Sequence, residues 1–528
     1  MIRSSRRSLT WLDVGLLALL ALLFYGPAIW GHRPLSVHEA RLPQLAREMV
    51  WFDGDWLLPT SGGRPWLERP PLPHWATAVS MMFFGGSTNS LSAPRMPTAL
   101  CGFLIGWLAA WMAARWFGRG VGLLAGLVTI SSYEIYQYAT LAEDDIYLGL
   151  IVTAAMALFV RARWPINAKD RPLPGNPLVS FLSLRPWHVT LSFVLLGLTN
   201  LVKGPLVGAM PVFATVGILV LLDRDWKTLR RIGWLWGGVI FLALTLAWPV
   251  WAWKHYPDVV ANWRYDILGQ SEFEPETAAK WNEPAWYYLT VLPLSLAPWT
   301  WATVIGLIAT AGKAWRRRGS PYRFIWCWAF VSLLLLSAAA RKHHHYLVPT
   351  MVPWAILSTL GLVYTGRWLA ARAKAVTLPR LTTTVLAGCV IAGGFVQLRV
   401  AGRDDRTLAE LDLMSRMKKN VPPGEPVFIN ADTDSLRFFR LQYTIRRDSH
   451  LIQNLSFLLS EDLNWPELFV LTKVSDLPYL RRLGQVKELD RTAPSRKNAS
   501  PGSQFAIFSL KPFADLPRTA TLPAVGVL

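Results

Sequence analysis

Long apolar segments recur along almost the whole chain, and they constrain its fold more than any other feature. About 20 consecutive apolar residues form a helix long enough to cross the hydrocarbon core of a bilayer. About eleven such segments can be placed, with ends uncertain by several residues. They lie at roughly 12–30, 95–114, 121–139, 146–162, 187–202, 205–222, 232–253, 285–312, 324–340, 346–364 and 381–399. The sequence therefore predicts an all-α polytopic membrane protein.

The composition agrees with this prediction and removes several other classes. Of the 528 residues, 52% are hydrophobic and only 17% are charged, whereas soluble chains carry about 25% charged residues. The net charge of +20 would suggest nucleic acid as a partner, but Lys and Arg fall in short clusters between apolar segments and not along one basic face. No nucleic acid is therefore expected. Cys101, Cys327 and Cys389 all lie in apolar segments, which offers neither a disulfide framework nor a CxxC metal site.

The distribution of charge between the loops predicts the orientation. The amino terminus carries Arg3, Arg6 and Arg7 before the apolar run 14–30. This run is long for a signal peptide, lacks a clear cleavage site and is followed by further spans, so we expect a retained first helix. With the amino terminus in the cytoplasm, the inner segments hold about twice as many Lys and Arg residues as the outer loops, as the positive-inside rule requires. Acidic residues gather in the outer loops.

The composition changes after Arg399. Residues 403–515 mix charges of both signs with short apolar runs at 426–429 and 468–471 and a helix-like stretch at 408–419. This pattern is typical of a small soluble α/β domain, and an odd number of spans places it outside the cytoplasm. We therefore expect a transmembrane domain at 1–402, an extracytoplasmic domain at 403–515 and a loose tail at 516–528.

The first outer loop, about 31–92, is too long to be a simple connection, and such loops are usually functional. Residues 42–51 show helical spacing typical of an amphipathic surface helix. Further on, Glu68 and Arg69 stand side by side before two prolines that keep the chain extended. The planar guanidinium of Arg69 suits a phosphate, because it can engage two oxygens at once. The alternative is that Glu68 and Arg69 only solvate a loop.

The second outer loop consists of little besides Glu143, Asp144 and Asp145. Adjacent carboxylates at a membrane surface repel one another and need a cation, a proton or a hydroxyl partner. A metal site or a general base is the functional interpretation, and a solvated turn is the structural one. Glu134 and Tyr138, one and two helical turns earlier, either share this site or pack in the core.

Two cationic segments follow on the same outer side. Lys203 ends an apolar segment just before Gly204 and Pro205, and its side chain either reaches for the interface or meets an anionic headgroup. The segment from Lys342 to Tyr346 contains three consecutive histidines. Neighbours on a helix point about 100° apart and seldom bind one metal ion together. A cationic rim for phosphate is the favoured interpretation.

All these candidates fall on the outer face, which holds neither ATP nor nucleotide sugars. Group transfer there requires an activated donor that has crossed the membrane, and a lipid-linked phosphate meets that need. A carboxylate would deprotonate the acceptor hydroxyl, while Arg and Lys would stabilise the departing phosphate. Inversion by a single displacement needs one base and no covalent nucleophile.

Several motifs follow one another along about residues 10–365. They are His38-Glu39-Ala40-Arg41, Ala46-Arg47-Glu48-Met49, Gly54-Asp55-Trp56-Leu57-Leu58-Pro59, Glu68-Arg69-Pro70-Pro71-Leu72, Ala93-Pro94-Arg95, Lys203-Gly204-Pro205, Glu283-Pro284-Ala285-Trp286-Tyr287-Tyr288, Pro298-Trp299 and Lys342 to Tyr346 followed by Pro349 and Pro353. In this order they resemble the motifs of bacterial glycosyltransferases with the C-type membrane fold. The nearest group is the undecaprenyl-phosphate aminoarabinose (lipid A) transferases, with the dolichyl-phosphate-mannose protein mannosyltransferases as relatives.

The resemblance implies roles for single residues. Glu39 matches the second residue of the family's Asp-Glu pair, which supplies the general base, and Asp145 matches the acidic residue of the second loop. Glu68 matches the Glu of the Glu-Lys-Pro-Pro motif, and Arg69 replaces its Lys. Lys203 matches the Lys of Lys-Gly-Pro, and Tyr346 matches a tyrosine that lines the lipid-phosphate site. Lys342 is predicted to join Glu68, Arg69, Lys203 and Tyr346 in binding the donor.

Two departures from the family pattern concern the chemistry. His38 stands where the family usually has Asp. One alternative is that His38 takes over proton transfer, as an ordinary imidazole pKa near 6.5 permits. The others are that Glu39 or Asp145 does so, or that the activity has changed or been lost. The loop after the seventh span has Gln270-Ser271-Glu272-Phe273 where a histidine is often found. A divalent metal ion is thus left open as cofactor, its ligands unknown, and no nucleotide cofactor is expected.

The expected function is transfer of a sugar, an aminoarabinose-like pentose or a hexose, from a polyprenyl-phosphate donor to an envelope acceptor. Lipid A, another glycan or a protein would be the acceptor, at the outer face of a bacterial cytoplasmic (inner) membrane. Two alternatives remain. One is a transporter or carrier of polyprenyl phosphate or another anionic lipid, which the lack of an internal repeat disfavours. The other is a catalytically inactive paralogue.

Overall fold

The structure is a computed structural model, and the residues that it describes are interrupted by gaps. They are 8–30, 34–36, 38–52, 54–61, 64–85, 90–164, 187–204, 207–226, 234–257, 259–260, 263, 283–339, 342–372, 377, 380, 382–385, 387–388, 391, 412–413, 416–417, 419–422, 425–430, 443, 449–452, 455, 458, 466–492 and 504–513. The chain forms two compact units. One comprises Met1–Gly31, Leu67–Pro73 and Arg95–Gln397, and the other His32–Trp66, His74–Pro94 and Leu398–Leu528.

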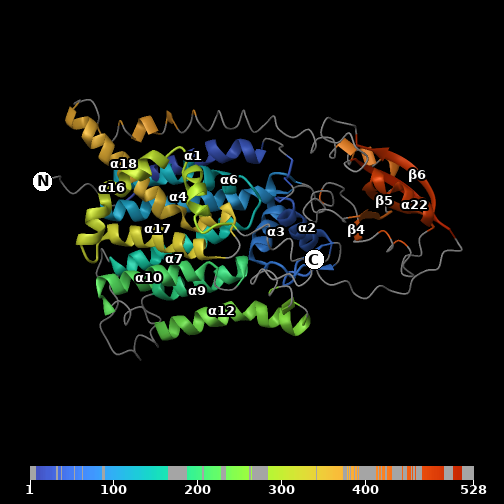
Figure 1. Ribbon diagram of the computed structural model, residues 1–528, viewed down its shortest axis with the longest axis horizontal. Helices are drawn as coiled ribbons and strands as arrows, with labels where there is room; N and C mark the ends of the chain where they lie inside the picture. The colour runs from blue at the N-terminus through green and yellow to red at the C-terminus, as the bar shows by residue number, and fades with distance from the viewer. Residues whose placement is uncertain are drawn as a thin grey trace. The chain divides into compact units, whose positions relative to one another are not determined.

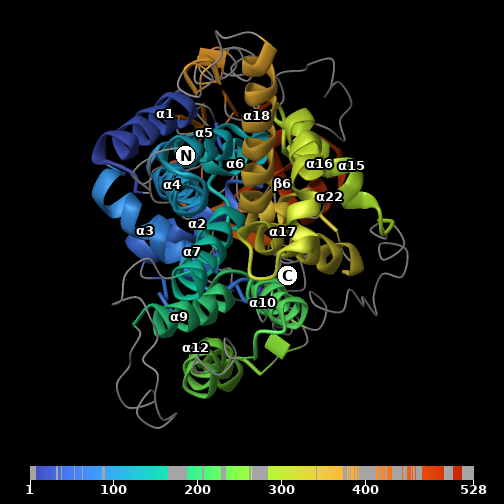
Figure 2. The same cartoon turned by 90° about the vertical axis from the view of Figure 1, so that its left-hand side faces the viewer.

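The first unit is a bundle of apolar helices (Figure 1). Its main helices are α1 (Trp11–Trp30), α4 (Met96–Phe117), α5 (Arg119–Ser131), α6 (Tyr133–Ala139), α7 (Asp145–Arg163), α9 (Trp187–Lys203), α10 (Ala209–Asp223), α12 (Trp234–His255), α15 (Tyr287–Ser295), α16 (Thr300–Arg316), α17 (Pro321–Ala338) and α18 (Met351–Arg372), with the 3₁₀ helix η3 (His344–Thr350) before α18. Figure 2 shows α7 close to α9, while α12 lies at the edge in both views.

The helices confirm a multi-pass membrane protein. Within the described residues, six are long and apolar enough to cross a membrane, or seven if the bent pair α15 and α16 counts as one span. Ten of the eleven predicted segments contain helices of this unit, but the number of crossings stays a prediction, because several of these helices are short. The eleventh segment, 381–399, lies mostly outside the described residues, as do the predicted tail and the amino-terminal arginines.

Two of the predicted spans are each broken into two helices. The segment 121–139 is interrupted at Ser132, whose backbone is extended. The segment 285–312 is not one straight helix, because α15 and α16 meet at 110°. Pro298 lies in this bend and cannot donate the backbone hydrogen bond that a continuous helix needs. The sequence prediction of a single helix here was wrong.

The two breaks are joined by hydrogen bonds. The Tyr133 backbone N–H donates to the Ala297 carbonyl at 3.0 Å. The indole Nε1 of Trp299 donates to the Ser131 hydroxyl, also at 3.0 Å. Helix breaks leave backbone groups without intrahelical partners, and inside a membrane protein such groups must be satisfied by neighbouring segments. This contact fixes the start of α6 against the end of α15.

The second unit joins residues of the first outer loop to the carboxy-terminal residues. The loop contributes α2 (Arg41–Trp51), most of α3 (Leu72–Phe84) and the hairpin of β1 (Thr60–Ser61) and β2 (Arg64–Pro65). The carboxy-terminal part contains α22 (Leu477–Leu483) and a five-stranded sheet in the order β4-β3-β5-β7-β6. Its strands are β3 (Val427–Asn430), β4 (Ser449–Ile452), β5 (Leu468–Lys473), β6 (Gly484–Arg491) and β7 (Phe505–Pro512).

The sheet is mixed. The strand β3 pairs in parallel with both β4 and β5, and β7 runs antiparallel to β5 and β6. The predicted apolar runs 426–429 and 468–471 coincide with β3 and β5, because strands buried on both faces read as continuous apolar segments. The helix-like stretch 408–419 coincides with helical residues where it is described.

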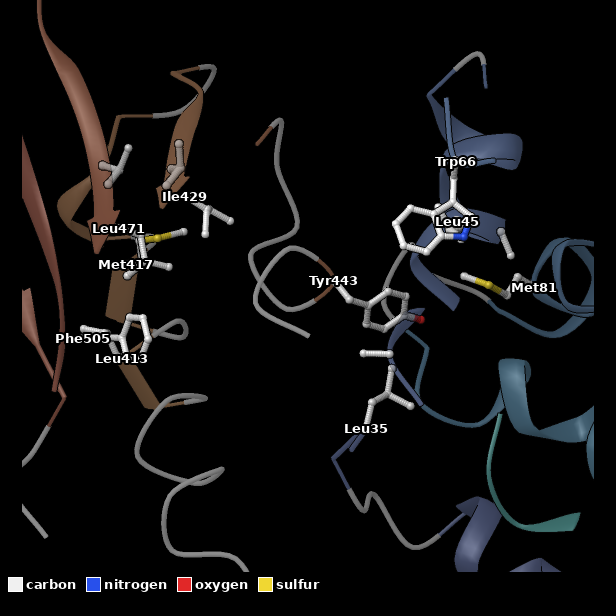
Figure 3. Close-up of a cluster of buried hydrophobic side chains, with 14 of the residues drawn as sticks. Leu35, Leu45, Trp66, Met81, Leu413, Met417, Ile429, Tyr443, Leu471 and Phe505 are labelled. Atoms are coloured by element: carbon white, nitrogen blue, oxygen red, sulfur yellow. The ribbon is translucent and has the colours of Figure 1, made fainter. Parts of the chain in front are cut away.

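One hydrophobic cluster of the second unit combines loop and carboxy-terminal side chains (Figure 3). Leu45 and Trp66 come from the loop, Ile429 and Phe505 from the sheet, and Tyr443 lies between the two groups. Every residue of α2 from Leu42 to Met49 is buried. The predicted boundary at 402 thus differs from the contacts, which group the loop with the carboxy-terminal residues.

A buried arginine also links the two parts of this unit. The Arg47 side chain donates from Nη1 to the Tyr443 carbonyl at 3.1 Å, and its guanidinium lies 5.3 Å from the centre of the Tyr443 ring. Burial lowers the pKa of Arg47 to about 10, so it remains charged at neutral pH. An Arg inside the protein is retained where it is paired with acceptors and aromatic faces.

Candidate active site

An ion pair in the first unit is formed where α7 begins and α9 ends. The Nζ atom of Lys203 lies 2.5 Å from Oδ1 of Asp145, and each side chain is only 7% exposed. Asp145 is the first residue of α7 and Lys203 the last of α9. A negative charge at a helix amino terminus and a positive charge at a carboxy terminus are each favourable. The two helix ends thus hold a buried pair that the sequence predicted as two separate candidates.

Gly204 explains why the chain turns directly after this lysine. Its φ is +85°, in the left-handed region that glycine adopts without the steric cost of a Cβ atom. The helix therefore ends with Lys203 in its last turn, beside the beginning of α7.

Tyr346 completes the surroundings of Lys203. The ammonium lies 4.5 Å from the centre of the Tyr346 ring, a distance at which the negative face of the ring attracts a cation. On the other side of the carboxylate, Nε2 of His345 is 3.9 Å from Oδ2 of Asp145. The 3₁₀ helix η3 supplies both residues, and it packs against α7. Asp145, Lys203, His345 and Tyr346 therefore form one site.

Arg69 adds a second cation to this site. It belongs to the first unit and lies close enough to Lys203 and His345 to interact with both electrostatically. The Glu68 and Arg69 side chains are half-buried. Asp144 also interacts with Lys203 electrostatically. Lys203 and Arg69 together offer two cations to an anionic group.

Lys342 has a different environment from the one predicted. Its side chain is buried, and Nζ donates to the Glu283 carbonyl at 2.9 Å. Tyr288 also donates from its hydroxyl to the His343 carbonyl at 3.2 Å. These two bonds tie the segment before η3 to the residues that precede and begin α15. The phosphate-binding role of Lys342 stays a prediction.

Glu39 and His38, the other predicted catalytic residues, belong to the second unit. The Glu39 carboxylate is fully buried and accepts from the Ser36 N–H at 3.1 Å, while the Ser36 hydroxyl accepts from the Glu39 N–H at 3.2 Å. This reciprocal pattern is a capping box before α2. His38 is exposed. Their catalytic roles stay predictions, and the cap shows that Glu39 also has a structural function.

The metal prediction can be compared only with the described side chains. Within these ranges, no group of three or more His, Cys, Asp or Glu side chains could hold a metal ion. The His343 and His345 rings stack at 5.1 Å between centroids, with 7° between their planes. Stacked rings do not converge on one ion. Residues 270–273 lie outside the described residues.

Sequence reasoning missed one part of this region. Glu134 was set aside as a residue that either shares the site or packs, and Ser295 was not considered. Ser295 donates from its hydroxyl to Oε2 of Glu134 at 2.9 Å, and both are buried. The signal available in the sequence was the pair Pro293 and Pro298, which interrupts an otherwise helical segment.

Comparisons with known proteins show which fold this chain has. A model of the family described as dolichyl-phosphate-mannose-protein mannosyltransferase matches residues 68–169. The structure resembles ArnT from Cupriavidus metallidurans in the apo state, with a TM-score of 0.72, 16% identity and coverage of 94% of this chain and 97% of that one. It also resembles an oligosaccharyltransferase from Archaeoglobus fulgidus, with a TM-score of 0.55, 12% identity and coverage of 89% and 70%. The fold is that of the C-type membrane glycosyltransferases.

The sequence relatives are more particular. The chain is 29% identical over 335 residues to an undecaprenyl phosphate-alpha-4-amino-4-deoxy-L-arabinose arabinosyl transferase of Shewanella sediminis, covering 62% of this chain and 56% of that enzyme. It is 30% identical over 355 residues to one from Sodalis glossinidius, covering 66% and 58%. The chain is thus a homologue of the undecaprenyl-phosphate aminoarabinose transferases, and it spans less than two thirds of the length of these relatives.

Proposed function

We propose that the chain is an inverting glycosyltransferase that takes a sugar from a polyprenyl-phosphate donor. The observation that carries the proposal is the buried Asp145–Lys203 pair, with the Tyr346 ring on the lysine and Arg69 nearby. The relatives are named for an undecaprenyl-phosphate sugar, and a second ArnT structure, with a TM-score of 0.71, is described as bound to undecaprenyl phosphate. Similarity to both proteins supports the same class of donor here.

In this mechanism the protein recognises the donor by its charge. Lys203 and Arg69 would hold the phosphate that joins lipid and sugar. Asp145 and the Tyr346 ring hold the Lys203 ammonium in one place, so that little reorganisation is needed when negative charge develops on the leaving phosphate. The acceptor oxygen attacks the anomeric carbon, the bond from that carbon to the phosphate oxygen breaks, and the electron pair leaves with polyprenyl phosphate.

The sugar is proposed to be an aminoarabinose-like pentose or a hexose, and the acceptor a lipid A, another glycan or a protein. The reaction is proposed for the outer face of a bacterial inner membrane, with the amino terminus in the cytoplasm. The loop charges support this orientation through the positive-inside rule. Glu39, His38 and Asp145 are proposed to take part in proton transfer.

A transfer assay tests the proposal. Purified protein in phospholipid vesicles is supplied with radiolabelled polyprenyl-phosphate aminoarabinose or mannose and with lipid A, glycan or protein acceptors. We expect one donor to be consumed and its label to appear on one acceptor. The variants Glu39→Gln, His38→Ala and Asp145→Asn identify the residues that matter, and transfer unaffected by all three would contradict the site assignment.

Two other outcomes would replace the proposal. If no donor is consumed but vesicles loaded with labelled polyprenyl phosphate show movement between leaflets, the chain is a lipid carrier. If the protein binds undecaprenyl phosphate and neither reacts nor moves it, the chain is an inactive paralogue.

A further inference from the structure

A second polar cluster lies in the same unit, and the mechanism above does not use it. Glu134 of α6 is buried, and one of its oxygens accepts from the Ser295 hydroxyl. The other, Oε1, lies 3.6 Å from Nδ1 of His344. The hydroxyl of Tyr138, one turn further along α6, is 3.3 Å from the same Nδ1. A buried carboxylate, a histidine and two hydroxyls are thereby connected.

The fold holds this carboxylate in place from both sides. The joined helix breaks described above, with the Tyr133–Ala297 and Ser131–Trp299 hydrogen bonds, place the start of α6 against the end of α15. Placing a carboxylate inside a membrane protein is costly, and such residues usually have a functional partner. Here Ser295 satisfies one carboxylate oxygen, and His344 faces the other at 3.6 Å.

The orientation of His344 decides what the cluster can do. Its Nδ1 faces Glu134 and Tyr138, both buried, while 47% of the side chain is exposed. The open edge of the ring therefore carries Nε2. The Glu134 carboxylate, 3.6 Å from Nδ1, favours a proton on that nitrogen, and the Tyr138 hydroxyl can then accept from Nδ1–H. In this tautomer Nε2 has a free lone pair and can accept a proton.

The cluster is adjacent to the proposed donor site. His344 precedes His345, whose Nε2 is 3.9 Å from the Asp145 carboxylate. The Tyr138 ring contacts both histidines, with centroid distances of 6.0 Å to His344 and 6.1 Å to His345. A proton acceptor at His344 would therefore lie beside the ion pair proposed to hold the phosphate.

We propose that Nε2 of His344 accepts the proton that the acceptor hydroxyl loses, and that Glu134 is the positioning residue that orients His344. This inference rests on the proposed function. In the step, the acceptor oxygen bonds to the anomeric carbon, the carbon–oxygen bond to phosphate breaks with its electron pair on the phosphate, and the proton moves to Nε2 and then to solvent. An acceptor that reacts through an ionised phosphate loses no proton and needs no such base. The Glu134–His344 pair therefore favours acceptors that react through a hydroxyl.

Several other charged or titratable groups face His344 and would contribute to its pH response. Glu143 and Asp145 interact with it electrostatically from the second loop and α7, and Tyr287 of α15 faces its backbone. His345 lies beside it on η3. The test must therefore distinguish Glu134 from these neighbours. The variant Glu134→Gln does so, because it replaces one oxygen of the Glu134 carboxylate and leaves the other groups unchanged.

Hydrolysis of the donor tests the proposal without knowledge of the acceptor, because water then supplies the hydroxyl. Purified full-length protein in vesicles is given the radiolabelled polyprenyl-phosphate sugar that the wild type consumes, and release of free sugar is followed from pH 5 to 9. We expect His344→Gln to lower kcat about 100-fold, the scale of general base catalysis. Glu134→Gln should lower kcat and change the acid limb of the pH profile, with KM nearly constant, and Glu134→Asp should restore part of the rate.

Ser295→Ala is the matched control, because it removes one hydrogen bond to Glu134 and leaves the carboxylate. We expect it to lower kcat less than Glu134→Gln. Binding of undecaprenyl phosphate reports whether each variant is folded, and binding that falls in step with kcat would show a merely structural role. A His344→Gln variant with kcat near that of the wild type would overturn this inference alone. A wild type that consumes no donor would overturn the proposed function as well.

Discussion

The first unit contains two ion clusters at opposite ends of α7, and they are built differently. At the start of the helix, Asp145 pairs with Lys203, and the lysine's other described neighbours include an aromatic ring and a further cation, Arg69. At the other end, about 28 Å away by the rise of a 19-residue helix, Arg163 faces Asp223 and Asp225. Asp144 also interacts with Lys203, and the Arg163 guanidinium lies 5.6 Å from the centre of the Trp164 ring. Both clusters therefore combine carboxylates, cations and an aromatic face, and they differ in how the donors of their cations are used.

The second cluster is also closed by the backbone. Arg323 pairs with Asp223 at 2.8 Å and donates to the carbonyls of Ala314 at 2.8 Å and Trp315 at 2.5 Å. The Gly319 N–H donates to the same Asp223 oxygen at 2.9 Å. A guanidinium whose donors are used by carbonyls and a carboxylate has little capacity left for a ligand. Buried ion pairs beside aromatic faces therefore do not by themselves mark a site. The two clusters differ because Arg323 donates to backbone carbonyls, whereas the Lys203 ammonium donates to the Asp145 carboxylate.

The largest effect is expected from Lys203. The variant Lys203→Met removes the proposed phosphate ligand, so transfer should fall about 100-fold or more, the scale of losing one donor to developing charge. Initial rates of transfer measure this. The double variant Asp145→Asn with Lys203→Met leaves no unpaired charge and serves as the folding control. Full activity in the folded double variant would show that the pair is structural, like its counterpart at Asp223.

Arg323→Met should act in the opposite way. It leaves the Asp223 carboxylate without its closest cation, and breaking a buried pair costs about 3–5 kcal/mol. Thermal unfolding in detergent should show a lower Tm, while the folded fraction transfers sugar at the wild-type rate. A large loss of kcat without loss of stability would remove the distinction between the two clusters.

A smaller effect is expected at the aromatic face. Replacing Tyr346 by Leu removes the cation–π contact with Lys203, worth about 1–2 kcal/mol where the pair is desolvated, and transfer should fall about 10-fold. Tyr346→Phe keeps the ring and should lose less. Equal losses in the two variants would assign the role of Tyr346 to its hydroxyl and not to its ring.

The smallest effect concerns a partly exposed ion pair in the second unit, between Arg416 and Asp490. Partial burial works to raise the pKa of the Asp490 carboxyl, but hydrogen bonds from Arg416 and from the Arg491 N–H outweigh it, and the pKa lies below its usual value of 3.8. The carboxylate therefore stabilises the fold above pH 3.8, and this contribution is lost as the pH falls through the lower, folded-state pKa. Because the pair is partly exposed, we expect less than about 1 kcal/mol.

Hydrogen exchange in β6, corrected for the intrinsic rate at each pH, measures this contribution. The control Asp490→Asn should remove the pH dependence of protection in that strand. If the pH dependence of protection in β6 is unchanged in Asp490→Asn, another carboxylate is its cause.

The sequence predicted the helical elements well, because a membrane helix is encoded locally by some 20 apolar residues. Asp145 and Lys203 stood out as candidates because charges at the ends of apolar segments are rare, whereas the role of Tyr346 was implied by the family resemblance. The structure brings the three residues together. The break between α15 and α16 was missed, although Pro293 and Pro298 signalled it. Hydropathy averages over a window and does not register where a backbone hydrogen bond is lost.

The pairing of distant segments could not be predicted. Glu134 and Ser295 meet where two helix breaks pack together, and His344 comes from a third segment, η3. Local periodicity contains no information on such contacts. The apolar face of α2 was expected on a membrane surface, but the structure covers it with protein. An amphipathic pattern shows that a face must be covered, and it does not show what covers it.

The central claim is that the Asp145 end of α7 binds a lipid-linked phosphate and the Asp223 end does not. Binding of radiolabelled undecaprenyl phosphate to the purified protein tests it most directly, in the wild type, Lys203→Met and Arg323→Met, the last assayed below its Tm. We predict saturable binding that Lys203→Met weakens at least 10-fold and Arg323→Met leaves unchanged. Binding that both variants weaken equally, or that neither changes, would contradict this assignment.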